Sequence, residues 1–395
     1  MYSIYILWLL IIALSIILIK LLNIKKNYIV CFCTTILIIL FILNLQDCMD
    51  AALMGCSLVV KAIVPTIFPF TVICNILISY DGIGLYSKVM GPLFCKPLGL
   101  SKACSFPLAA SFLCGYPLGA KYCSEIYEMG YIKEKEYLRV LNIATNAGPI
   151  FLIGSVGAAM LSSPKYGYIL LIANYLSIII VGFLTKRKNE NCQFDRAIAP
   201  NFKTKNFGTA LKQAIESGIN TTLTVGAFVI MFSVFISIIK NNAQISIVLH
   251  SLEDLLKLPT DSLYGLFLGS IEFTNGCKLI STSTLSINLK LSMISFICSF
   301  SSLSVIAQVS SVVSKYNPPM NKYIFWKFIQ GVLSFFITFG VSKIFLKTTT
   351  VSNIIISTEK IYTNAFISIL PVILLLILTL ICKVIFRVLR KLHTS

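Results

Sequence analysis

Charged residues are scarce in this chain of 395 residues, where they make up only 12% of the sequence. Soluble domains carry roughly twice that share, about 25%. Acidic residues are the scarcer sign, with 15 Asp and Glu against 33 Lys and Arg, for a formal net charge of +18. Because 57% of the residues are hydrophobic and uncharged stretches of about 20 residues recur, a polytopic membrane protein is predicted. The basic excess is then typical of cytoplasmic loops rather than of nucleic-acid binding.

Motifs of catalysis and metal binding are also missing. The two histidines, His250 and His393, lie far apart, and no His-x-x-Glu-His, Ser-His-Asp or Walker-type sequence is present. The 13 cysteines lack Cys-x-x-Cys spacing, and only Cys31-Phe32-Cys33 comes close to it, so we interpret them as small apolar residues. We therefore expect no enzyme activity, no cofactor and no metal, and no ATP-driven transport by this chain.

The hydrophobic pattern predicts an all-α fold with about nine transmembrane helices. The first apolar stretch has its basic residues after it rather than before it, which indicates an uncleaved span and not a signal peptide. The expected spans are residues 1–22, 29–45, 103–120, 141–161, 166–184, 263–280, 291–313, 323–345 and 363–381.

Two further apolar stretches, residues 63–80 and 222–239, each follow an amphipathic segment, residues 50–61 and 208–220. If residues 63–80 crossed the membrane, the basic run within 186–205 would lie outside, against the positive-inside rule. We therefore expect both stretches to be re-entrant hairpins, with both ends of the second one, near Lys212 and Asn241, on the cytoplasmic side. A short tilted span is the alternative for each.

The order of elements repeats along the chain. A shift of 157 residues places Tyr116-Pro117-Leu118-Gly119-Ala120-Lys121 on Phe273-Thr274-Asn275-Gly276-Cys277-Lys278, so that an aromatic residue, a Gly and a Lys coincide. The charge-derived topology starts one copy outside and the other inside, which predicts an inverted repeat. The expected units are an N-terminal helix pair (1–46), a first repeat (47–184), a basic cytoplasmic linker (185–207), an inverted second repeat (208–345), and a C-terminal helix with a basic tail (346–395).

Polar residues and helix breakers inside the apolar stretches are the candidate site. A broken helix in lipid needs protein or a water-filled cavity to satisfy its freed backbone groups, and an intramembrane acid is a functional candidate by default. The candidate binding residues for a substrate or ion are Gly115, Tyr116, Pro117, Gly119, Lys121, Asn146, Gly148, Pro149, Glu272, Thr274, Asn275, Gly276 and Gln308.

Each of these residues also has a structural interpretation. The Gly and Pro residues suit a packing kink at a span end, Asn146 a capping turn, and Gln308 interhelical packing. Glu272 suits either a proton or sodium site or a buried ion pair with Lys278 or Lys121.

Five motifs together resemble the YlbJ family of sporulation integral membrane proteins. They are Pro65-x-x-x-Pro69-Phe70, Gly115-Tyr116-Pro117-x-Gly119-Ala120-Lys121, Asn146-x-Gly148-Pro149-x-Phe151-x-x-Gly154-x-Val156-Gly157, Gly269-x-x-Glu272-x-Thr274-x-Gly276 and Leu303-Ser304-Val305-x-x-Gln308. The family is classed with the nucleoside-recognition or Gate domain, which resembles the core of concentrative nucleoside transporters. The chain departs from the family pattern at Ser301-Ser302, where glycines are usual, and at Ile306-Ala307, where a His is frequent.

The resemblance implies a protein of the inner membrane of an endospore-forming bacterium, in the forespore or mother-cell membrane, with a role in spore cortex formation. Our leading hypothesis is a transporter-like protein in the lipid bilayer that moves a small polar solute, nucleoside-like or other, with H⁺ or Na⁺. The alternative is a scaffold that binds other sporulation membrane proteins without transport. No nucleic-acid partner is expected.

Overall fold

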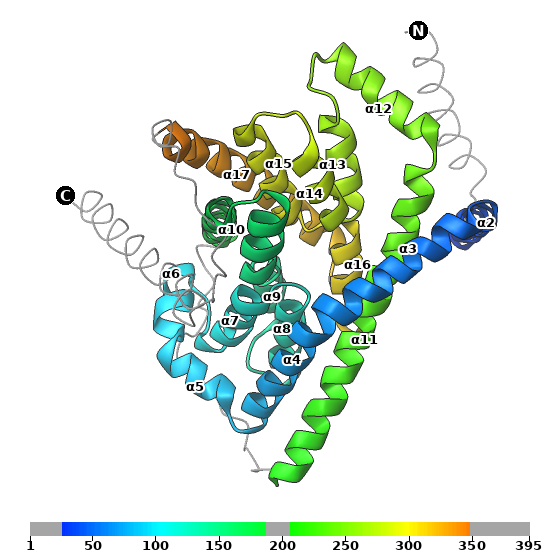
Figure 1. Cartoon of the computed structure of the whole chain (residues 1–395). Coiled ribbons are helices and arrows are strands. Elements are labelled where there is room, and N and C mark those ends of the chain that lie inside the picture. The colour runs from blue at the N-terminus through cyan, green and yellow to red at the C-terminus, as the bar shows by residue number, and fades with distance from the viewer. Residues whose placement is uncertain (1–25, 187–205, 348–395) are drawn as a thin grey trace, which may run out of the picture.

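The computed structural model describes residues 26–186 and 206–347, and every regular element in these two ranges is helical (Figure 1). Four helices in this part of the chain are long and apolar enough to cross a membrane, or up to six if each of two bent helix pairs is one span. The predicted all-α polytopic fold is confirmed, whereas the count of nine spans is not. Two of those nine, residues 1–22 and 363–381, lie outside the described residues.

A long helix begins each half of the chain. In the first half α3 (Leu45–Leu58) continues through a π-helical turn η1 (Val59–Ile63) into α4 (Val64–Ser79), and in the second half α11 (Phe207–Lys240) runs for 34 residues. The expected re-entrant hairpins at 63–80 and 222–239 are therefore wrong, and the amphipathic segments before them belong to the same helices. Pro65 does not break the chain direction because it lies in the first turn of α4, where its missing N–H is tolerated.

These two long helices cross as an antiparallel pair (Figure 1). Small residues lie where their backbones approach: a Cβ added to Gly55 would lie 3.0 Å from Cα of Ile230, and one added to Gly226 would lie 2.9 Å from a methyl carbon of Val59. Such small residues allow close helix packing in membranes, where van der Waals contact replaces the hydrophobic effect.

The re-entrant hairpins lie instead at the two segments that we expected to be spans 103–120 and 263–280. The first hairpin consists of α7 (Ser105–Cys114) and α8 (Leu118–Glu128), and the second of α13 (Ser262–Ile271) and α14 (Phe273–Thr282). Ten or eleven residues of helix are about 15–17 Å long, about half the hydrocarbon core. The arms of each hairpin pack side by side, so the chain reverses its direction at each tip.

Glycines determine how closely the arms of the second hairpin approach. A Cβ on Gly276 would lie 2.1 Å from Cα of Gly269, and one on Gly265 would lie 2.7 Å from the Ile280 side chain. In the first hairpin the rings of Phe106 and Tyr122 pack edge to face, with centroids 5.2 Å apart. Each of these contacts joins a residue before a tip to a residue after it, which is the geometry of antiparallel arms.

A broken span and a whole span follow each hairpin. The broken spans are α9 (Glu134–Ile143) with the π-helical η4 (Ile150–Met160), and α15 (Ile287–Phe300) with α16 (Ser302–Val312). The whole spans are α10 (Pro164–Leu184) and α17 (Met320–Lys347). Ser301 breaks the second pair in the left-handed conformation at φ 74°. The expected spans 166–184 and 323–345 are confirmed as continuous helices, 141–161 is interrupted, and 291–313 contains this single break.

The helix α2 (Lys26–Leu43) meets α3 at a bend of 97°. The remaining helices are connections between the elements above. They are α5 (Gly82–Val89), η2 (Gly91–Cys95), α6 (Lys96–Leu98), η3 (Lys102–Cys104), α12 (Ala243–Leu255) and η5 (Ser314–Tyr316).

Basic connections gather at one end of the molecule. Lys186, after α10, donates a hydrogen bond to the Pro97 carbonyl at 3.5 Å, and Lys315, after α16, forms an ion pair with Glu128 at the end of the first hairpin. In each half, one expected hairpin is a continuous helix and one expected span is a hairpin. The number of membrane crossings expected before Lys186 is therefore unchanged. The positive-inside argument for this end therefore still holds, although it was first applied to the wrong elements.

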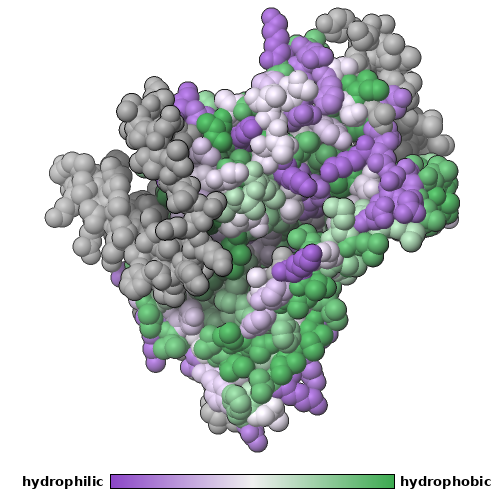
Figure 2. Space-filling model, viewed as in Figure 1, coloured by the Kyte–Doolittle hydropathy of each residue, from purple (hydrophilic) through white to green (hydrophobic). Residues whose placement is uncertain are grey.

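Large apolar side chains are exposed on the outer helices, among them Phe32 on α2, Met54 on α3, Leu223 on α11 and Phe336 on α17. Figure 2 shows hydrophobic residues over much of the lower half of the visible face, where α4 and the start of α11 lie. Exposure of this kind is expected of helices that face lipid.

Candidate functional site

The tips of the two hairpins meet inside the protein. In Figure 1 the first hairpin, α7 and α8, lies in the lower half of the molecule and the second, α13 and α14, in the upper half. The ring of Tyr116 at the first tip packs edge to face on Phe273 at the second, with centroids 5.4 Å apart. Phe151 of η4 also packs edge to face on Phe273, with centroids 4.7 Å apart. An aromatic cluster thus joins both tips to a broken span.

The first tip lies directly on the break between α9 and η4. Gly115 has φ 84°, and a Cβ there would lie 2.6 Å from the backbone nitrogen of Gly148. The backbone N–H of Tyr116 donates to the Asn146 carbonyl at 2.7 Å. A Cβ on Gly119 would lie 1.9 Å from the Ala144 carbonyl oxygen. The glycines of this motif therefore permit backbone-to-backbone contact between hairpin and break.

Asn146 lies at the centre of a buried hydrogen-bond network. Its side-chain amide donates to Ser111 Oγ at 3.1 Å and to the Ile143 carbonyl at 2.7 Å, and its Oδ1 accepts from Gln330 Nε2 at 3.1 Å. Asn146 thus links hairpin, break and α17. Gly148 and Pro149 complete the turn, with Pro149 directly before η4.

Lys327 of α17 is the most important residue that the sequence analysis missed. Its side chain is fully buried, and its ammonium donates to the Thr145 carbonyl and, at 2.6 Å, to Gln330 Oε1. Tyr323, one turn earlier, donates to Thr145 Oγ1 at 3.0 Å. The carbonyls that α9 leaves unpaired at its end carry partial negative charge, which a cation stabilises. A lysine within the expected span 323–345 was the available signal.

Glu272 forms the second tip, where it separates α13 from α14. Its carboxylate accepts from the backbone N–H groups of Thr274 at 3.0 Å and Asn275 at 2.9 Å, and from Asn275 Nδ2 at 2.9 Å. It is the N-cap of α14, a position that favours an acid. The side chain remains partly exposed. Both oxygens of the carboxylate have hydrogen-bond donors.

The expected ion pair of Glu272 with Lys278 or Lys121 does not form among the described residues. Lys121 of α8 donates to Ser217 Oγ of α11 at 2.8 Å and lies 3.7 Å from Glu125. Pro117 is the N-cap of α8, and Gly276 packs against Gly269 within its own hairpin. Gln308 is buried on α16, which packs against α8, α11 and α13. Lys121 is therefore directed at a long helix, whereas Gln308 lies on a helix that contacts one arm of each hairpin.

One buried polar atom at the junction has no partner. The hydroxyl of Tyr116 makes no hydrogen bond within residues 26–186 and 206–347, although the side chain is enclosed. A buried hydroxyl without a partner is costly unless a ligand or water satisfies it. This hydroxyl belongs to one ring of the aromatic cluster.

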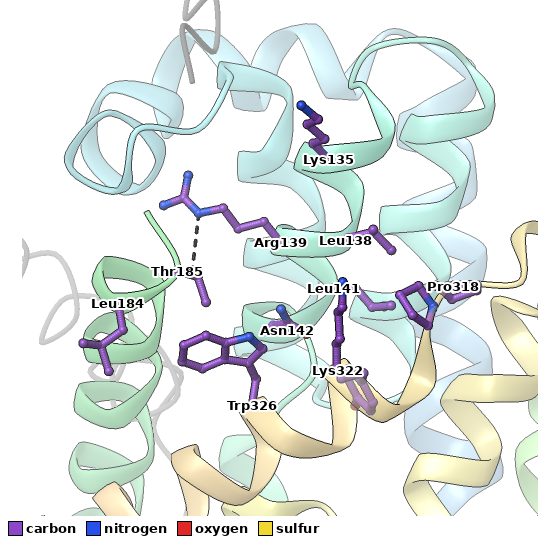
Figure 3. A pocket seen from close by; sticks show the side chains of 12 residues that line it. Lys135, Leu138, Arg139, Leu141, Asn142, Leu184, Thr185, Pro318, Lys322 and Trp326 are labelled. Atoms are coloured by element: carbon purple, nitrogen blue, oxygen red, sulfur yellow. Dashed lines mark hydrogen bonds between the residues drawn. The ribbon is translucent and has the colours of Figure 1, made fainter. Parts of the chain in front are cut away.

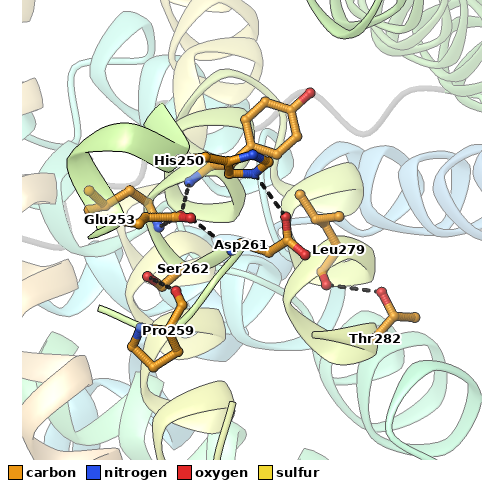
Figure 4. Close-up of polar contacts among 9 residues, drawn as sticks. His250, Glu253, Pro259, Asp261, Ser262, Leu279 and Thr282 are labelled. Atoms are coloured by element: carbon orange, nitrogen blue, oxygen red, sulfur yellow. Dashed lines mark hydrogen bonds and ion pairs between the residues drawn. The ribbon is translucent and has the colours of Figure 1, made fainter. Parts of the chain in front are cut away.

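Acids at the base of each hairpin have a structural role. Glu253 of α12 is buried and accepts from the N–H groups of Asp261, Leu263 and Tyr264 at 2.6–3.0 Å, which caps α13 (Figure 4). His250 lies 3.2 Å from Asp261 in the same cluster. Glu136 of α9 accepts from the Ser101 N–H at 2.5 Å, just before η3 and α7. These contacts fix the entry of both hairpins.

Comparison with known proteins confirms the resemblance expected from the motifs. Residues 60–141 match the Gate family, described as nucleoside recognition, a range that contains the first hairpin. The chain is 28% identical over 308 residues to the sporulation integral membrane protein YlbJ of Bacillus subtilis (strain 168), covering 73% of this chain and 76% of that protein.

Among solved structures, the chain is similar to CNTnw in an inward-facing substrate-bound state, with 20% identity and a TM-score of 0.48 over 70% of this chain and 74% of that one. It is also similar to a CNTnw variant in an outward-facing state, with 18% identity and a TM-score of 0.45 over 73% of this chain and 76% of that one.

Proposed function

We propose that this protein is a sporulation membrane protein that moves a small polar solute through the junction of its two hairpin tips. The single observation that carries the proposal is the contact of Tyr116 with Phe273, which brings two half-membrane hairpins together at broken helices. Discontinuous helices of this kind, in corresponding positions of two halves, are where membrane carriers bind their substrates.

We further propose that the two halves of the chain form an inverted repeat. Residues 47–184 and 208–345 are two copies of one unit, long helix, hairpin, broken span and span, placed in opposite orientations. The basic end with Lys186 is cytoplasmic by the positive-inside rule. The first hairpin then enters from the cytoplasm and the second from outside, which explains why their tips meet within the membrane.

The chemistry of the junction supports a polar, partly flat solute. The aromatic cluster offers stacking surfaces, the Tyr116 hydroxyl offers a hydrogen bond, and Glu272 offers a carboxylate that can bind Na⁺ or exchange H⁺. The relative named for sporulation supports a site of action in the forespore or mother-cell membrane during cortex formation. The proposal requires no catalytic chemistry.

A non-transporting scaffold is the second candidate, and one observation favours it. The network of Asn146, Lys327 and Gln330 ties α17 to the break through satisfied hydrogen bonds, as a rigid packing core would. A scaffold would bind other sporulation membrane proteins and would not need the tips to separate.

Locking the tips together distinguishes the two functions. Cysteines at positions 116 and 273, on a background without native cysteines, are crosslinked with a short thiol reagent in a sporulating host that lacks its own copy. A carrier must open at this junction, so crosslinking is expected to abolish cortex formation, and a reducible crosslinker should restore it on reduction. Heat-resistant spores and cortex thickness are measured.

The control is a crosslink between positions 295 and 334, where Ser295 Oγ and Ser334 Oγ lie 2.6 Å apart between α15 and α17. This pair lies away from the tips and should be tolerated. Full function with the tips locked would refute the carrier and support the scaffold.

A further inference from the structure

A cavity of about 250 Å³ lies between α9, the end of α10 and the start of α17, away from the hairpin tips (Figure 3). It therefore joins the first half of the chain to the second. Lys135 and Arg139 approach it from α9, Lys322 and Trp326 from α17, and Leu184 from α10.

The charge around this cavity is of one sign. Three of its lining residues are basic, Lys135, Arg139 and Lys322, and none is acidic. Glu136, which neighbours Lys135 in sequence, is directed at the Ser101 N–H instead. Lys135 and Lys322 are exposed and have no ion-pair partner in the part of the chain that the structure describes. Two cations are therefore available to an anion.

Arg139 gives the cavity a fixed wall. Its guanidinium is buried and donates to the carbonyls of Leu98, Gly99 and Gly182, the last two at 3.1 and 2.9 Å. Asn142, one helical turn along α9, is also buried at the cavity, and its side-chain amide has no hydrogen-bond partner among the described residues. The fixed positive charge of Arg139 and the available amide of Asn142 both favour a phosphate group in this cavity.

The cavity lies at the ends of two candidate membrane spans. It opens at the last residues of α10 and the first residues of α17, which are two of the four full-length span candidates. Trp326 and Tyr323, which line it, are typical of the membrane–water interface. Leu184 and Leu138 give it an apolar side. The sequence Lys186-Arg187-Lys188 follows α10 directly, which places this end in the cytoplasm by its charge.

We propose that this cavity binds a phosphate group, and that its source is the headgroup of an anionic phospholipid of the cytoplasmic leaflet. Basic pockets between transmembrane helices on this side are suited to such headgroups. The phosphate lies between Lys135 and Lys322 while an acyl chain follows Leu184 and Trp326. The bound lipid then ties α9 to α17 across the two halves. Soluble phosphate presents the same charge without the acyl chain.

The test compares lipids and soluble phosphate on the purified full-length protein. Native mass spectrometry and thermal unfolding are measured after exchange into vesicles of phosphatidylglycerol or of phosphatidylcholine, and separately in phosphatidylcholine with millimolar inorganic phosphate. Retained phosphatidylglycerol and a higher melting temperature with it are expected. The variant Lys135→Gln/Lys322→Gln should lose about tenfold or more in lipid affinity, because each basic residue at an anionic surface contributes about 1 kcal/mol.

The matched control is Lys165→Gln/Lys257→Gln, which removes the same charge from two exposed lysines distant from the cavity. It should leave lipid binding unchanged, and Lys135→Arg/Lys322→Arg should retain it. Equal losses in the control and the cavity variant would overturn the site in favour of general surface charge. Binding of inorganic phosphate with no preference for phosphatidylglycerol would overturn the lipid source.

Discussion

Tyr116 and Phe273 are 157 residues apart in sequence and pack edge to face with their ring centroids 5.4 Å apart. Each residue is at or beside the tip of its own hairpin. Neither hairpin is long enough to cross the membrane, so each supplies half of a buried junction that the other completes.

The first prediction is topological. Because α11 is one continuous helix, Lys212 and Asn241 lie on opposite sides of the membrane, with Lys212 on the side of Lys186. Single cysteines at these three positions, on a background without native cysteines, are labelled with a membrane-impermeant maleimide. Only position 241 should react from outside. Equal protection of positions 212 and 241 would restore the hairpin that we first expected and remove the inverted repeat.

The second prediction concerns close packing of the first hairpin. Gly119→Ala places a methyl group 1.9 Å from the Ala144 carbonyl oxygen, so the hairpin must move away from the break. We expect a loss of about 1–3 kcal/mol in stability, the usual cost of overpacking. Gly154→Ala is the control, since nothing lies within 4 Å of its added Cβ. Thermal unfolding in detergent should separate the two variants clearly.

The third prediction concerns Lys327. In Lys327→Met the Thr145 carbonyl and Gln330 Oε1 lose their donor, and buried acceptors without a partner cost about 1–3 kcal/mol each. The break between α9 and η4 should loosen. Hydrogen exchange at the Tyr116 amide, which bonds to the neighbouring Asn146 carbonyl, should become faster.

Lys343→Met serves as its control, because Lys343 is exposed on the same helix and lies over the ring of Phe339. In Lys343→Met, hydrogen exchange at the Tyr116 amide should be as fast as in the wild type. If Lys327→Met also leaves that exchange unchanged, the ammonium does not position the break.

The fourth prediction is mechanistic and rests on the proposed transport. Glu272→Gln keeps one cap oxygen for α14 but cannot titrate or carry a charge, so we expect normal insertion and failure of cortex formation. Glu272→Asp should retain partial function, because aspartate is also a good N-cap with a shorter reach. Glu216→Gln, which removes an exposed acid of α11, should be neutral. Normal cortex in Glu272→Gln would exclude coupling through this carboxylate.

The fifth prediction is a pH dependence at the cytoplasmic end. The hydrogen bond from Lys315 lowers the pKa of Glu128, so this pair stabilises the fold above the ordinary pKa of a glutamate, about 4.3, and is lost as the pH falls. The effect should be small, since the pair is exposed. Melting temperatures of wild type and Lys315→Gln should differ slightly at pH 7 and converge below about pH 4. A difference that persists at low pH would assign the effect to packing.

The sequence analysis placed helix breaks where the structure has them, but it interpreted each broken segment as one span rather than as two hairpin arms. Residues 103–120 and 263–280 have the length of one span, and a hydropathy window cannot distinguish one such span from two short arms joined at Gly115 or Glu272. The positive-inside argument counts crossings, and any one non-crossing element in each half satisfies it. It therefore predicts the same side for Lys186 with the hairpins that we expected and with those that the structure has.

The residues of the candidate site were also predicted only in part. Asn146 and Tyr116 were identified from helix breakers beside polar residues, and the structure places them in contact. Their partners Lys327 and Gln330 lie in an uninterrupted helix with no motif around them. Only the tertiary fold shows that the end of α9 needs a cation there.

Lys327 also has a consequence for how the protein is made. A buried ammonium is costly when no acceptor receives it. Its acceptor, the Thr145 carbonyl, is more than 180 residues upstream and leaves the ribosome first. Synthesis from the N-terminus therefore inserts the acceptor before the donor, and α17 enters a bilayer in which its charge already has a partner. A separately expressed second half would lack that acceptor and would insert poorly until the first half is supplied.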